Sequence, residues 1–239
     1  MNRLLQQLRS DLRKHASKKK AKILQRFFKT GPGEYAEGDI FLGVMVPAIR
    51  TVTKHYQHLD VKHVVALLKS PVHEERLCAL LILVLQYARA GEALKKNIVR
   101  LYLHHTRYIN NWDLVDVSAG HIVGAFLLNR DKRLLYALAK SRLLWERRIA
   151  IVSTHYFIKH NTFEETVRIG RLLLADEHDL IHKAVGWMLR EVGKRNQAVL
   201  EQFLGQHHAS MPRTMLRYAI ERFPPAKRKA YLNGKTAVA

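Results

Sequence analysis

Acidic residues, long apolar runs and strand signals are all scarce in this sequence. Its 239 residues hold 20 Asp and Glu against 41 Lys and Arg, which gives a formal net charge of +21. Such a charge favours a polyanionic partner, nucleic acid first and an anionic membrane surface second. The longest apolar run, Leu77 to Leu85, is far shorter than the roughly 20 residues that cross a bilayer. We therefore expect a soluble, cytoplasmic protein, associated with the nucleoid if bacterial, that needs no membrane.

Most signatures of catalysis are also missing. The one cysteine, Cys78, cannot form an internal disulfide, and its apolar surroundings predict a buried thiol rather than a nucleophile. The sequence has no phosphate-binding glycine loop, no dinucleotide-binding motif and no metalloprotease motif. Its 14 histidines form no cluster with cysteine or carboxylate at metal-ligand spacing, and acidic residues are too sparse for a two-metal nuclease.

Helical periodicity runs along nearly the whole chain and predicts an all-α protein. With 48% hydrophobic residues, the chain can bury enough apolar surface to exclude wholesale disorder. Asp131, Asn161 and Asn196 are expected to start helices after short turns. The principal helices are predicted at residues 74–87, 113–128, 146–159, 182–194 and 213–223.

Small residues recur inside these helices at Ala79, Ala150, Gly186 and Ala219. With Val115–Asp116 in the position between the first two, the period is roughly 35 residues. Such a period indicates helical pairs stacked into an α-α superhelix, a HEAT-like solenoid. No linker rich in Pro, Gly or Ser interrupts the chain, so we expect one domain over residues 1–239, with a frayed tail after about residue 231.

Basic residues gather at the expected helix ends and turns, and in a solenoid such ends align along one edge. The pattern predicts a concave basic face that follows a phosphate backbone, against the alternative of an ordinary solvated surface. The clusters are Lys18–Lys20 with Lys22, Arg130–Arg133, Arg147–Arg148, Lys194–Arg195 and Lys227–Lys229.

One segment, residues 110–116, combines an indole with carboxylates. Trp112 and Asp116 are four residues apart, so a helix would carry both on one face. Asp113 is expected to cap or favour the helix start. A carboxylate at Asp116, one turn inside an apolar helix, is costly if buried without a partner, and this favours a functional role.

Two later segments carry the remaining candidates. Arg148 begins an apolar helix, and it could pair with Asp116 or hold a phosphate in bidentate fashion. In the segment 182–191, Gly186 would let another helix approach closely. Trp187 beside it would be either a core residue or part of a cleft.

The segments Asn111–Asp116, Trp145–Ile151 and Lys183–Glu191 resemble those of the AlkD-type DNA alkylation repair glycosylases, a HEAT-like repeat family. Phe41–Arg50 is similar to the family's opening F-L-G-x-x-x-P-x-x-R element, and the resemblance runs in order from about Phe41 to about Phe223. The resemblance does not place the first forty residues, with their glycine-rich loop.

This resemblance implies a DNA glycosylase that hydrolyses the N-glycosidic bond of cationic alkylated purines, such as 3-methyladenine and 7-methylguanine, in duplex DNA. It implies base excision repair by a monomer without a base-binding pocket, a metal or a cofactor. Asp116 would be the catalytic carboxylate, and Trp112 and Trp187 would pack against the deoxyribose. The DNA contacts would come from Arg148, Arg50, Lys183 and Arg190. The alternative is a DNA- or RNA-binding helical-repeat protein without catalytic activity, and a protein–protein scaffold is a third possibility.

Overall fold

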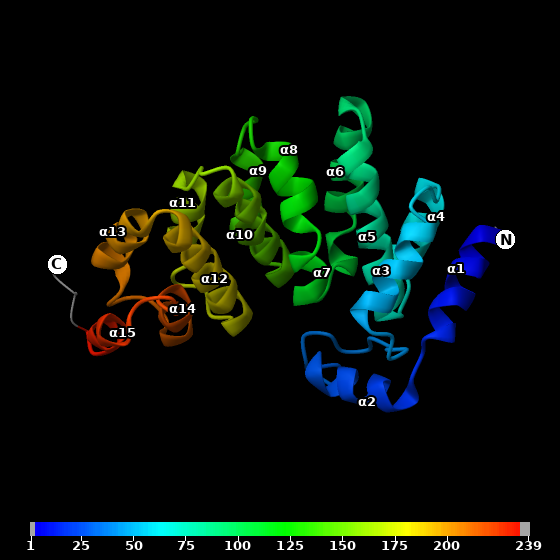
Figure 1. Cartoon of the computed structure of the whole chain (residues 1–239), viewed down its shortest axis with the longest axis horizontal. Helices are drawn as coiled ribbons and strands as arrows, with labels where there is room; N and C mark the ends of the chain where they lie inside the picture. The colour runs from blue at the N-terminus through cyan, green and yellow to red at the C-terminus, as the bar shows by residue number, and fades with distance from the viewer. Residues whose placement is uncertain (1–2, 235–239) are drawn as a thin grey trace. The chain divides into compact units, whose positions relative to one another are not determined.

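The structure is a computed structural model that describes residues 3–234, and its regular elements are helices (Figure 1). Within these residues no strand forms, and β-type pairing is limited to a bridge between Ile40 and Val72. The all-α prediction is therefore confirmed. No helix of this part of the chain is long and apolar enough to cross a membrane. The tail expected to fray after residue 231 is helical up to Leu232, and residues 235–239 lie outside the described part.

The chain divides into two compact units, Met1–Ile122 and Val123–Ala239. The first unit is built around α5, which packs against α3, α4, α6 and α7. The residues of α5 from His73 to Leu83 are all buried, so the helix is enclosed on nearly all sides over this length, as expected in the middle of a core. Its helices are α1 (Arg3–Lys14), α2 (Lys18–Phe27), α3 (Val46–His55), α4 (Val61–Leu68), α5 (His73–Arg89), α6 (Glu92–His104), the 3-10 turn η1 (Thr106–Tyr108) and α7 (Trp112–Asp116).

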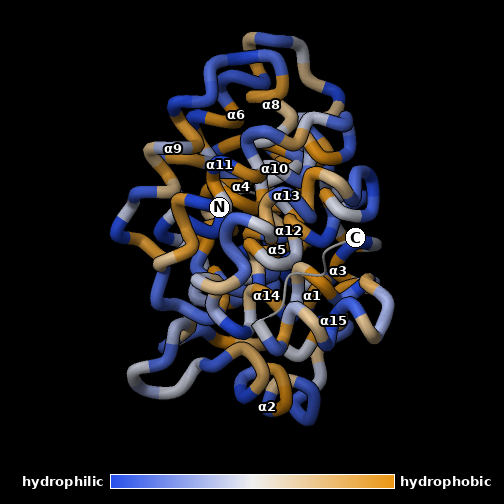
Figure 2. The backbone as a smooth tube through the Cα atoms, turned by 90° about the vertical axis from the view of Figure 1, so that its left-hand side faces the viewer, coloured by the Kyte–Doolittle hydropathy of each residue, from blue (hydrophilic) through white to orange (hydrophobic). Residues whose placement is uncertain are grey.

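The second unit consists of successive helix pairs, α9/α10, α11/α12 and α13/α14, and in the first two pairs the second helix is the longer one. The second helices α10, α12 and α14 pack against one another in succession, which confirms the predicted helical pairs within this unit. Hydrophobic and hydrophilic residues alternate along the helices (Figure 2). The helices are α8 (Ala125–Leu127), α9 (Arg133–Ala139), α10 (Leu144–Lys159), α11 (Glu164–Leu172), α12 (Asp179–Arg195), α13 (Gln197–His207), α14 (Arg213–Ala219) and α15 (Pro225–Leu232).

The buried small residues let these helices approach closely. Ala79 and Ala150 are fully buried, and a Cβ on Gly186 would press on the backbone of Met215 in α14. The close approach predicted for Gly186 is therefore confirmed. The predicted buried thiol is confirmed as well, because Cys78 is fully buried and burial raises its pKa to about 11.

Two sequence-based expectations were wrong in detail. The helix expected at residues 113–128 is interrupted, because α7 ends at Asp116 and the π-helical turn η2 (Gly120–Gly124) precedes α8. The hydroxyl of Ser118 donates to the carbonyl of Leu114, and two glycines follow, which weakens a regular helix here. Asn161 does not start a helix: it has a φ of 57° and follows the end of α10, a left-handed conformation that Asn tolerates. Asn196 caps α13 as expected.

Candidate functional site

The short helix α7 carries the indole and the carboxylate that the sequence singled out. Asn111 precedes it in an extended conformation, and its side-chain oxygen accepts a hydrogen bond from the backbone N–H of Trp112 (2.8 Å). The cap is therefore Asn111 and not Asp113, since Asp113 is engaged elsewhere. Trp112 and Asp116 are the first and last residues of α7, both partly exposed. Their i, i+4 spacing within one helix places them on the same side of it.

An aromatic cluster supports the indole of Trp112 from the interior of the first unit. Phe28 stacks on one face of the indole, with ring centroids 5.4 Å apart and planes at 24°, and Phe27 meets it edge-on at 5.9 Å. Phe41 in turn stacks on Phe28 at 5.1 Å. One indole face is thus occupied by protein, while the residue as a whole stays partly exposed.

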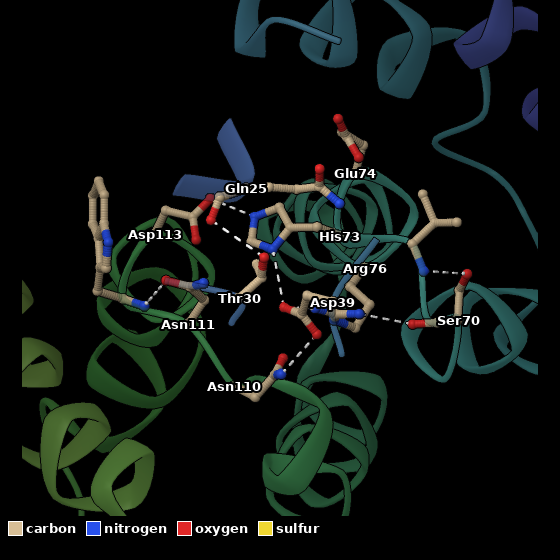
Figure 3. Close-up of polar contacts among 12 residues, drawn as sticks. Gln25, Thr30, Asp39, Ser70, His73, Glu74, Arg76, Asn110, Asn111 and Asp113 are labelled. Atoms are coloured by element: carbon tan, nitrogen blue, oxygen red, sulfur yellow. Dashed lines mark hydrogen bonds and ion pairs between the residues drawn. The ribbon is translucent and has the colours of Figure 1, made fainter. Parts of the chain in front are cut away.

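A buried ionic network lies beneath this cluster and involves the residue next to Trp112 (Figure 3). His73 Nε2 donates to the Asp113 carboxylate at 2.8 Å, and Nδ1 faces Asp39 at 3.7 Å. Arg76 donates to Asp39 at 2.5 Å, and Asn110 donates to the other oxygen of Asp39 at 3.1 Å. The network ties α5, the loop before α3 and the start of α7 together.

These contacts favour the charged forms of both His73 and Asp39. Burial opposes the protonation of His73, but the attraction of Asp113 and Asp39 outweighs it and raises the pKa of His73. Burial likewise opposes the ionisation of Asp39, yet His73 and Arg76 lower the pKa of Asp39 overall. The imidazolium also stacks on Phe41, with centroids 4.5 Å apart. Aromatic contacts therefore hold Trp112 itself, and ionic contacts hold its neighbour Asp113.

The F-L-G element is anchored by a second buried carboxylate. Glu74 accepts hydrogen bonds from the backbone N–H groups of Leu42, Gly43 and Val44 at 2.8–3.1 Å. Gly43 has a φ of 81°, and a Cβ there would overlap the backbone of Ser17. This element therefore has a structural role, since it positions Phe41 under the aromatic cluster. Arg50, which follows it in α3, is exposed.

Asp116, at the end of α7, lies near the buried hydroxyl pair of Tyr102 and Ser118, whose oxygens are 2.9 Å apart. Burial raises the pKa of Tyr102, and the charge of Asp116 adds to this effect. The Tyr102 hydroxyl is therefore neutral at physiological pH. The environment of Asp116 is thus partly exposed and polar.

The other predicted site residues belong to the second unit. Arg148 is 4% exposed and donates to the carbonyl of Leu180 at 2.5 Å. Lys183 pairs with Asp179 at 2.7 Å, while Arg190 pairs with Glu191 and Glu221. All three cations thus have partners within their own unit, and their DNA contacts stay a prediction.

Trp187 in α12 is partly exposed, and its ring lies 5.6 Å from that of His155 in α10. It therefore packs beside a polar ring and is not sealed in the core. Its expected place beside Trp112 stays a prediction, because the two indoles belong to different units.

Sequence reasoning missed the contribution of α2. The side chain of Phe27 is exposed and Phe28 is buried, and both contact Trp112. At the other end of the same helix, Lys18–Lys20 and Lys22 are exposed, and their side chains make no ion pair within residues 3–234. The Phe27–Phe28 pair close to the basic cluster is a feature that could have indicated a functional role for this helix. Its contact with Trp112 could not be predicted, because the two segments lie far apart in the chain.

The fold and the site define an all-α helical-repeat protein with an aromatic platform beside a carboxylate and a basic helix. The model of the DNA alkylation repair enzyme family matches residues 8–223, and the chain belongs to this family. Among solved structures, the chain is similar to a predicted DNA alkylation repair enzyme from Enterococcus faecalis, with 14% identity and a TM-score of 0.69. That alignment covers 88% of this chain and 98% of the other. A search of the curated proteins finds no match. The membership supports a role in the repair of alkylated DNA.

Proposed function

We propose that this chain is a DNA glycosylase of the AlkD type, which releases cationic alkylated purines from duplex DNA as a single domain and a monomer. The observation that carries the proposal is the pairing on α7 of a supported indole, Trp112, with a partly exposed carboxylate, Asp116. A protein that only binds DNA has no evident need for this pair. The cationic lysines of α2 supply an electrostatic contact with the phosphate backbone.

The chemistry suits these residues. An alkylated purine that carries a positive charge is already a good leaving group, so the reaction requires no general acid, metal or cofactor. Positive charge moves to the deoxyribose as the glycosidic bond breaks, and a carboxylate stabilises that charge. At about 4 Å and an effective dielectric constant of about 20, the interaction is worth roughly 4 kcal/mol, or on the order of a thousandfold in rate. Asp116 also orients the attacking water.

The indole of Trp112 complements this charge. The ring quadrupole attracts a cation with about 0.5–2 kcal/mol, so an indole against the sugar favours the oxocarbenium-like state. Trp187 adds a second indole in our proposal, with Arg148 near the lesion and Arg50, Lys183 and Arg190 at phosphates. Because Arg148 is buried, we expect its contribution to depend on the contacts of α10 with α12.

The test is release of free base from methylated duplex DNA under single-turnover conditions. We expect Asp116→Asn to reduce the rate by about 100- to 1000-fold while DNA affinity is retained. Asp60→Asn is the matched control, because Asp60 is exposed and precedes α4 without a side-chain cap. If the wild type releases no more base than a sample without enzyme but still binds duplex DNA, the alternative of a non-catalytic DNA- or RNA-binding protein is correct.

A further inference from the structure

The second unit contains an open groove between α9 and α11, the first helices of two successive pairs, which lie side by side (Figure 1). Its volume is about 420 Å³, and it is lined by Tyr136, Lys140, Val167, Arg168, Arg171 and Leu172. The residues assigned to DNA in this unit come from α10 and α12, so the groove is built by other helices. We propose that this groove is a docking site for an acidic peptide segment of a partner protein that carries an apolar side chain between its carboxylates.

The charge of the groove is positive. Lys140, which follows α9, and Arg171, in the last turn of α11, are exposed, and neither forms an ion pair within residues 3–234. Arg168, the third cation, pairs with Glu164 at 2.5 Å. The carboxylate of Glu165 accepts a hydrogen bond from the hydroxyl of the lining tyrosine at 2.5 Å. The two cations without a carboxylate partner therefore favour an anionic ligand.

Aliphatic side chains distinguish this groove from a simple phosphate contact. Leu172 is 44% exposed at the end of α11, and Val167, which also lines the groove, is partly exposed. A phosphate gains nothing from such surface, whereas an apolar peptide side chain that packs against it removes apolar area from water. A segment with carboxylates on either side of a leucine therefore satisfies both the cations and the aliphatic wall.

The size of the groove and the charge of the protein narrow the choice of occupant. A volume of about 420 Å³ lies within the range of roughly 300–1,000 Å³ that is common for ligand pockets, so an apolar side chain and its neighbours can enter. A second copy of this chain is disfavoured, because two molecules with a formal net charge of +21 repel each other. Duplex DNA shares the negative charge of an acidic peptide but has no aliphatic side chain to bury.

The experiment measures the affinity of a dye-labelled dodecapeptide that repeats the tripeptide Glu-Leu-Asp. Salt at about 0.15 M screens exposed charges beyond roughly 8 Å and so reduces non-specific attraction. Lys140→Gln/Arg171→Gln removes the two unpaired cations of the groove. Lys96→Gln/Arg100→Gln is the matched control, because it removes the same charge from two exposed residues of α6 that also form no ion pair within the described part of the chain.

Two further comparisons test the aliphatic wall. Leu172→Ser shortens the exposed side chain in the groove, and Leu94→Ser is its control, because Leu94 in α6 is 46% exposed and lies in the other unit. A second peptide carries serine in place of each leucine, and a third carries glutamine and asparagine in place of the acidic residues.

We expect the wild type to bind the first peptide more tightly than the other two. Lys140→Gln/Arg171→Gln should weaken this binding roughly 2- to 30-fold and Leu172→Ser roughly 3- to 10-fold, whereas the α6 variants should change it less than about twofold. The affinity for duplex DNA should be the same in the groove variants and their controls.

The inference is overturned if the first peptide does not bind, if the serine peptide binds equally well, or if the α6 double variant loses as much affinity as the groove variant. A loss of affinity for duplex DNA in Lys140→Gln/Arg171→Gln that exceeds the loss for the peptide would assign the groove to nucleic acid and also overturn it. None of these measurements depends on the release of a base, so the docking site and the proposed glycosylase function stand or fall separately.

Discussion

A substitution of His73 is the sharpest test of how the ionic network holds Asp113 and, next to it, Trp112. The change is His73→Gln, which removes the imidazolium between Asp113 and Asp39 and leaves both carboxylates in place. His73 is 2% exposed, and its hydrogen bond to Asp113 is 2.8 Å long. Removal of one partner from a buried pair leaves an uncompensated charge and typically costs about 3–5 kcal/mol of stability. We expect a loss of this size at pH 6.

The same substitution predicts the sign of a pH dependence. Because the folded pKa of His73 is raised above the ordinary histidine value of about 6.5, the stability it contributes is fully present below about pH 6.5. It is lost as the pH rises through the folded pKa. In that interval the wild type should lose up to about 1.4 kcal/mol per pH unit relative to His73→Gln.

The assay is urea unfolding at several pH values, with the difference between wild type and variant plotted against pH, so that groups common to both cancel. His58→Gln is the control, because His58 is exposed and should give a small difference without a slope. A difference for His73→Gln that stays constant from pH 6 to pH 9, or that grows with pH, would refute this account of the network.

Two further substitutions test the loop that positions Phe41. Glu74→Gln keeps an acceptor for two of the three loop N–H groups but presents an amide N–H₂ to the third, so urea unfolding should show a loss of about 1–3 kcal/mol. Glu37→Gln, which loses one exposed backbone contact, should cost less than about 0.5 kcal/mol, and equal losses would contradict this explanation. Gly43→Ala should lower the free energy of unfolding by about 1–3 kcal/mol more than Gly33→Ala does. Both glycines have positive φ, but only the first would place a Cβ against the chain at Ser17, so equal effects would refute the steric argument.

The sequence predicted the positions of the helices better than it predicted the tertiary contacts that they make. Hydrophobic periodicity located α5, α10 and α12 nearly to their ends, because each is a long helix with a dominant apolar pattern. The π-helical turn after α7 was missed because it depends on the side chain of Ser118 and on local glycines rather than on periodicity. The role of Asn161 was misassigned because Asn both starts and ends helices.

At the candidate site, sequence spacing identified Trp112 and Asp116 but not the residues that support them. The contacts of Trp112 with Phe27 and Phe28 join segments far apart in the chain, and no local pattern encodes them. The same holds for the buried pair of His73 and Asp113, which lie 40 positions apart. A local argument could reasonably assign Asp113 to a helix cap, and only the tertiary structure shows that Asn111 fills this position.

The two carboxylates of α7 illustrate how environment assigns different roles to identical groups. Asp113 is 14% exposed in its side chain and is held by His73, so its charge is already used to stabilise the fold. Asp116, one turn later, is partly exposed, and its charge contributes to the raised pKa of a neighbouring tyrosine. A charge already engaged in a buried pair gains little from a cation that forms transiently. We therefore assign the positioning of the indole to Asp113, and the chemistry that we propose falls to Asp116, which lies on the same side of α7 as Trp112.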